Sequence, residues 1–72
     1  MKKNNTICLK IYDGSEGSEY IIHKNGDVNI TMISNGGIDS EVDVDVQSFG
    51  FNRPEELIAD LIMQGFSIEW PV

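Results

Sequence analysis

The sequence predicts an α+β domain in which an antiparallel sheet carries one helix on one face. Four segments alternate apolar and polar residues with the period of a strand, and turn residues separate them. A single stretch near the C-terminus has helical periodicity, and a fifth alternating segment follows it. The order β-β-β-β-α-β over 72 residues therefore predicts one domain, 1–72, built on a four-stranded meander and a C-terminal fifth strand.

The first two strands are expected at about 6–12 and 19–24. In the first, Ile7, Leu9 and Ile11 point to one side, and more polar residues point to the other. The segment 13–18 between them is polar and rich in glycine, so it is expected to be a flexible loop.

A third strand is expected at about 28–33, joined to the second through Asn25-Gly26, a strong hairpin signal. A two-residue loop would place Ile22 opposite Asn29, whereas a three-residue loop would place Ile22 opposite Val28. The second register is preferred because it gathers the apolar side chains of both strands on one face.

The fourth strand, expected at about 38–47 after the turn 34–37, is the most regular of the chain. Val42, Val44 and Val46 would face the core, and the opposite face would be almost entirely acidic. The fifth strand, at about 66–70, alternates Phe66, Ile68 and Trp70 with polar residues.

The helix is expected at about 53–64. Asn52 is the predicted N-cap, with Glu55 reaching back to it, and Pro54 suits the first turn. Gly65 and Phe66 predict a Schellman ending, in which Phe66 packs back on the helix.

A helix of this length could carry the chain across the sheet. The fifth strand would then pair with the first, giving the antiparallel order 5-1-2-3-4. The rival topology is a right-handed crossover that places the fifth strand parallel to the fourth.

Charge and cysteine content narrow the classes of function. The net charge of −7 disfavours direct binding to nucleic acid or to an anionic membrane, and it would attract a basic protein. Cys8 is the only cysteine, which excludes an internal disulfide and suits a reducing compartment. With no signal peptide or transmembrane pattern, the expected location is the cytoplasm.

The sequence offers no catalytic or cofactor constellation. His23 and Cys8 are each the only residue of their type, so neither a His-pair metal site nor a dyad with a second base can be built from one chain. Calcium is also disfavoured, because alternate carboxylates on a strand lie about 6.7 Å apart and cannot converge on one ion. No cofactor, no metal and no enzymatic activity are expected.

The candidate residues are therefore for partner binding. The acidic row could imitate a nucleic-acid backbone, or it could simply be a solvated face that protects an edge strand. The sheet face turned away from the helix would expose Cys8, Tyr12, Ile21 and Ile33, and an uncovered apolar patch of that kind indicates a partner. The full set of candidate residues is Asp39, Glu41, Asp43, Asp45, Met63 and Trp70.

These features favour a small acidic non-enzymatic interaction module of the kind found among bacterial or phage accessory proteins. It is expected to bind a protein, possibly a basic one, and to form a homodimer or small oligomer. The alternative is an acidic inhibitor that imitates nucleic acid and competes for the basic cleft of a nucleic-acid-binding protein.

Overall fold

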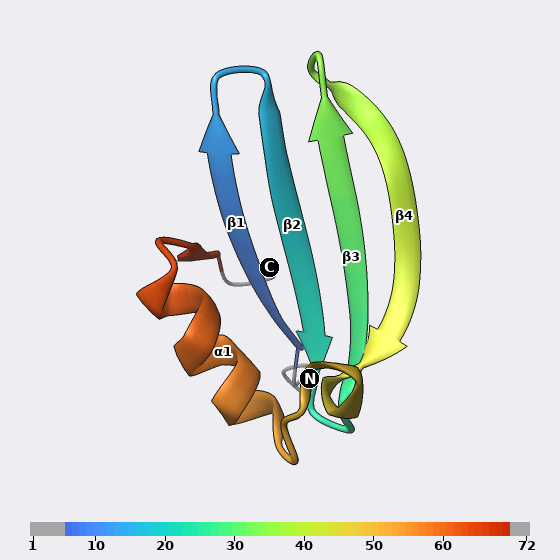
Figure 1. The fold of residues 1–72 in the computed structure, drawn as a ribbon, viewed down its shortest axis with the longest axis vertical. Helices are drawn as coiled ribbons and strands as arrows, with labels where there is room; N and C mark the ends of the chain where they lie inside the picture. Colours follow the sequence, from blue (N-terminus) through green and yellow to red (C-terminus); the bar gives the residue numbers. More distant parts are fainter. Residues whose placement is uncertain (1–5, 70–72) are drawn as a thin grey trace, which may run out of the picture.

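The computed structural model describes residues 6–69 and confirms the predicted α+β fold. Its elements are β1 (Thr6–Asp13), β2 (Glu16–His23), β3 (Asp27–Ser34), β4 (Gly37–Asp45), the 3-10 helix η1 (Val46–Phe49), α1 (Pro54–Met63) and β5 (Ser67–Glu69). The five strands form one antiparallel sheet in the order β4-β3-β2-β1-β5 (Figure 1). The fifth strand thus pairs with the first, as predicted. The rival topology, in which the fifth strand lies parallel to the fourth, is wrong.

The register between β2 and β3 is the one preferred from the sequence. Ile22 pairs with Val28 and Tyr20 pairs with Ile30, which leaves a three-residue loop around Asn25. The side chains of Leu9, Ile22 and Val28 consequently share one face, here called the helix face, and are almost fully buried. The opposite side of the sheet is called the open face.

The prediction of a flexible loop at 13–18 is wrong. Only Gly14 and Ser15 lie between β1 and β2, and the ladder continues to the pair of Asp13 and Glu16. The polar residues of this segment can still pair, because β1 and β2 keep one continuous register to its end and polar side chains are tolerated on the open face.

The fourth strand ends earlier than predicted, and its ladder contains a bulge. Met32 pairs with Ser40 but Ile33 pairs with Ile38, so Asp39 is an extra residue without a partner in β3. After Asp45 the chain enters η1, because the Asp45 carboxylate accepts a hydrogen bond from the backbone N–H of Ser48 at 3.1 Å.

The helix starts one residue later than the sequence predicted. Arg53, not Asn52, is the N-cap, and Pro54 is the first helical residue. The carboxylate that reaches back belongs to Glu56 instead of Glu55; its Oε1 accepts from the backbone N–H of Asn52 at 2.8 Å.

The predicted Schellman ending is confirmed. The Phe66 N–H donates to the Leu61 carbonyl and the Gly65 N–H donates to the Ile62 carbonyl, both at 3.0 Å. Gly65 has φ of 107°, a conformation that side chains disfavour. Phe66 packs against the buried cluster of Leu9, Ile22, Val28, Val46, Leu57 and Leu61.

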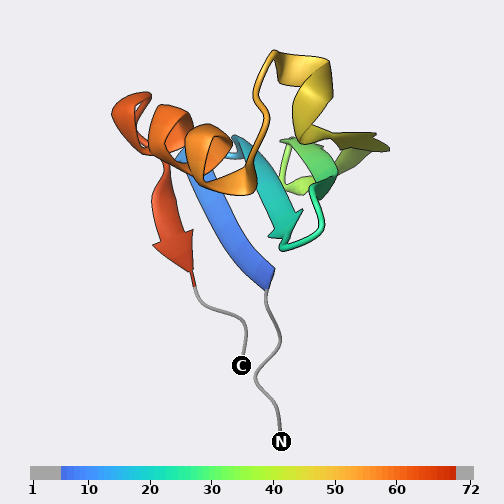
Figure 2. The same ribbon diagram turned by 90° about the horizontal axis from the view of Figure 1, so that it is seen from below.

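One layer of helix lies on one side of the sheet (Figure 2). Residues 46–53 carry the chain across from the β4 side, and α1 then runs roughly along β1 (Figures 1 and 2). A helix is about 10 Å wide and strands are about 4.8 Å apart, so α1 covers only two or three strands. The helix face of β3 and β4 is covered only at one end, by η1.

Candidate functional site

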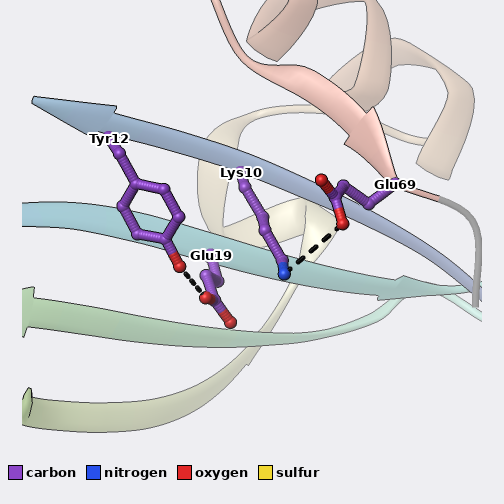
Figure 3. A network of polar contacts seen from close by, with 4 residues as sticks. All are labelled: Lys10, Tyr12, Glu19 and Glu69. Atoms are coloured by element: carbon purple, nitrogen blue, oxygen red, sulfur yellow. Dashed lines mark hydrogen bonds and ion pairs between the residues drawn. The ribbon is translucent and has the colours of Figure 1, made fainter.

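Polar contacts link three strands on the open face (Figure 3). The Lys10 Nζ lies 3.4 Å from the Glu69 carboxylate, which joins β1 to β5. On the next strand Glu19 pairs with Lys10 across the ladder and accepts a hydrogen bond from the Tyr12 hydroxyl. Of these four residues only Tyr12 belongs to the apolar patch expected from the sequence, and Lys10 and Glu19 lie between Tyr12 and the pair of Cys8 and Ile21 on the same face.

The carboxylates in this network hold their neighbours in the protonated form. Glu69, followed by Glu19, raises the pKa of Lys10 above its ordinary value of 10.5. The hydrogen bond to Glu19 raises the pKa of the Tyr12 hydroxyl above 10.0. A lysine and a tyrosine with raised pKa values are poorly suited to act as bases near neutral pH, so the network is best explained as a structural tie between strands.

Cys8 and His23 share the open face but do not form an activated pair. Cys8 pairs with Ile21, and the Nδ1 of His23 lies 3.0 Å from the Thr6 hydroxyl oxygen. Burial is the main cause that raises the pKa of the Cys8 thiol above 9.0. A reactive cysteine requires the opposite shift, because only the thiolate is nucleophilic.

The apolar patch expected on the open face is interrupted by polar residues, but Ile38, which pairs with Ile33 on that face, is 72% exposed. Cys8, Ile21 and Ile33 are only partly exposed, and polar residues of the same strands lie between them. Tyr12 is half exposed but its hydroxyl is occupied by Glu19. The alternation of apolar and polar side chains along one strand does not reveal which side chains of the neighbouring strands lie between them, so the polar interruptions of this patch were not predicted.

The acidic residues of β4 are exposed but they are not an even, free row. Asp39 lies at the bulge, Asp45 caps η1, and the Asp43 carboxylate accepts a hydrogen bond from the Asn29 side chain at 2.8 Å. Glu41 is exposed opposite Thr31. At the end of the sheet near η1 lies a hollow of about 630 Å³. Three acidic residues, Asp27, Asp43 and Asp45, line it together with His23, Val28, Asn29, Val44 and Ser48.

Exposed apolar side chains also lie on the helix face of β3 and β4 and on η1. Met32 and Val42 are 42% and 49% exposed, and Phe49 of η1 is 36% exposed. These three residues are here called the β3–β4 patch. Tyr20 lies between them and the core: it pairs with Ile30, and its ring centroid is 6.2 Å from that of Phe49 and 5.3 Å from that of Phe66.

Sequence reasoning placed Met32 and Val42 in the core and so missed this patch. The signal that could have found it is the number of helices: one helix cannot cover five strands.

The two remaining candidates lie elsewhere. Met63 projects from α1 and is 86% exposed, far along the chain from β4. Trp70 lies outside the described residues. Within residues 6–69 no group of three or more His, Cys, Asp or Glu side chains is placed to hold a metal ion.

Among the described residues no helix has the length and apolar character needed to cross a membrane. Comparison with protein-family models, with curated proteins and with solved structures found no match. The function is therefore inferred from the surface residues of this chain.

Proposed function

We propose that this protein is a non-enzymatic protein-interaction module that self-associates through the β3–β4 patch. The observation that carries the proposal is the partial cover of the helix face. The single helix leaves Met32 and Val42 exposed on the same face of two neighbouring strands, and Phe49 of η1, whose ring lies near Tyr20, is exposed as well. Contiguous apolar side chains of this kind on a small domain are typical of a surface that another polypeptide covers.

The geometry favours face-to-face packing of two copies over pairing through the β4 edge. In a two-fold antiparallel pairing of two β4 strands, Glu41 and Asp43 would lie next to the same residues of the second copy. Like charges opposite one another across a ladder are destabilising. The β3–β4 patch itself contains no charged side chain, so it can be buried without that repulsion.

The nucleic-acid-mimic alternative has less support. It needs a regular row of free carboxylates, and the bulge at Asp39 interrupts the row. Asp43 and Asp45 also accept hydrogen bonds within the chain. An enzymatic role likewise has little support, because burial raises the pKa of Cys8 and His23 lies against Thr6.

The proposal is tested by measuring molar mass with light scattering from micromolar to millimolar protein. The unmodified protein is expected to approach the mass of a dimer, and moderate salt should not dissociate it because the contact is apolar. The variant Met32→Gln/Val42→Thr should raise the dissociation constant by about tenfold or more.

A matched control removes apolar exposure elsewhere. In Ile62→Gln/Met63→Gln the changed residues are 45% and 86% exposed on α1. This variant should associate like the unmodified protein. A protein that stays monomeric at millimolar concentration, or a control that dissociates as much as the patch variant, would overturn the proposal.

A further inference from the structure

The outer side of β4 is a free strand edge. Within residues 6–69, β4 ends the sheet and pairs only with β3. In an antiparallel ladder about half of a strand's N–H and C=O groups point to each neighbour, so this nine-residue strand presents a row of unpaired backbone groups. At the other end of the sheet β5 has only three residues.

The two sides of this edge differ in chemistry. On the open face Glu41 and Asp43 are exposed, about 6.7 Å apart as alternate residues of a strand. On the helix face Ser40 and Val42 are exposed, and Val42 belongs to the β3–β4 patch. A strand added here would meet carboxylates on one face and apolar surface on the other.

The chemistry of these two faces determines which kind of strand can pair with the β4 edge. A second copy's β4 is disfavoured by charge repulsion, as argued above. A strand with Lys or Arg at alternate positions would instead pair oppositely charged residues across the ladder, and its intervening apolar residues would extend the β3–β4 patch.

We propose that the β4 edge binds an extended segment of a partner protein in which basic and apolar residues alternate, adding a sixth strand to the sheet. The backbone of the segment bonds to the outer N–H and C=O groups of β4. Its basic side chains lie against Glu41 and Asp43, and one of them can reach the hollow between Asp27, Asp43 and Asp45. Asp43 keeps acceptor capacity for this, because a carboxylate has about four lone-pair sites and Asn29 uses one.

This inference rests on the proposed function, because it assigns a partner to the same half of the sheet. The edge and the face are nevertheless separate surfaces. The patch side chains point away from the sheet, whereas the free backbone groups lie in its plane. Peptide binding and self-association can therefore be measured independently.

The test uses a fluorescent synthetic peptide of alternating Lys and Val, about as long as β4, in an anisotropy titration. Protein is kept at a concentration at which light scattering gives the monomer mass. A peptide of the same composition with its lysines in one block is expected to bind about tenfold more weakly, and an alternating Glu-Val peptide should not bind.

Two protein variants locate the site. Glu41→Gln/Asp43→Asn should weaken binding on the order of tenfold at low salt. The control Glu55→Gln/Glu69→Gln removes the same amount of charge from exposed positions on α1 and on β5, at the opposite edge of the sheet, and should weaken binding much less. Equal weakening by both variants would indicate attraction to the net charge alone and would overturn the inference.

Two N-methylated peptides distinguish strand addition from charge pairing. N-methyl groups are placed on all Val residues in one peptide and on all Lys residues in the other. Only one of these sets directs its N–H groups toward β4, so one peptide should lose binding and the other should keep it. If both bind as well as the parent peptide, no strand is added.

The possible failures are distinguishable. A protein that dimerises through the patch but does not discriminate the peptides contradicts the inference and leaves the proposed function standing. A protein that stays monomeric and binds no peptide contradicts both. Peptide binding by a strict monomer supports the edge site and overturns self-association.

Discussion

Tyr12 serves two structural purposes on the open face. Its ring covers Gly17, its partner across the ladder, and its hydroxyl donates to Glu19 two residues further along β2. Lys10 lies beside it between Glu19 and Glu69 (Figure 3). Of these side chains only that of Tyr12 was predicted to belong to an uncovered apolar surface. Its diagonal contact with Glu19 cannot be seen in the alternation of a single strand.

The raised pKa values predict that the protein loses stability at alkaline pH. The pKa values of Cys8, Tyr12 and Lys10 rise above their ordinary values of 9.0, 10.0 and 10.5 on folding. The folded state then binds protons that the unfolded chain releases, so stability is fully present below about pH 9 and falls as pH rises through this range. The midpoint of urea unfolding should be nearly constant up to about pH 9 and should decrease steadily from there to about pH 11.

The variant Tyr12→Phe is the control for this prediction. It keeps the ring over Gly17 and removes the hydroxyl that titrates, so its midpoint should decrease less over the same pH range. A midpoint that stays constant or rises above pH 9 would contradict the raised pKa values, which are caused by burial for Cys8 and by Glu19 and Glu69 for Tyr12 and Lys10.

At the scale of elements, short sequence signals correctly predicted the turns and the helix end that depend on a few adjacent residues. The Asn25-Gly26 hairpin, the Schellman ending at Gly65 and the Asn35-Gly36 turn all depend on a few adjacent residues. Asn35 and Gly36 have φ of 56° and 78°, the signs that a type I′ hairpin turn requires.

The bulge at Asp39 and the short helix η1 could not be predicted in the same way. Asp39 fits the alternation of β4 as well as its neighbours do, and its extra position appears only when β4 is aligned with β3. The end of β4 depends on whether Asp45 accepts a bond from Ser48, which competes with continued pairing.

The β1–β2 hairpin provides a stability test at this scale. A Cβ added at Gly17 would lie 1.9 Å from Cδ1 of Tyr12 and 2.5 Å from the Ile11 carbonyl oxygen. Because the second clash is with backbone, rotation of the Tyr12 ring cannot remove it. Gly17→Ala should therefore destabilise the protein by about 1–3 kcal/mol in urea unfolding.

Gly37→Ala is the matched control, because a Cβ at Gly37 has no heavy atom within 4 Å. Its effect should stay within about 0.5 kcal/mol. Equal stabilities for the two variants would contradict the close packing of Tyr12 on Gly17.

At the scale of the whole molecule, net charge and helix cover determine which surfaces remain available. The charge of −7 opposes the association of copies through acidic surfaces. One helix and one 3-10 turn bury Leu9, Ile22 and Val28 on the helix face but leave Met32 and Val42 exposed there. The sequence predicted exposed apolar residues on the open face, where Tyr12 and Ile38 are indeed exposed, but it did not predict those on the helix face, because the direction of α1 depends on tertiary packing.

The central claim is that the β3–β4 half of the sheet is the interaction surface. The most direct test is the change of backbone amide chemical shifts in isotope-labelled protein between micromolar and millimolar concentration. The account predicts that the largest changes fall on residues of β3, β4 and η1, with Met32, Val42 and Phe49 among them, and that α1 and β5 change little. Changes concentrated on α1 or β5, or shifts that do not depend on concentration, would contradict it.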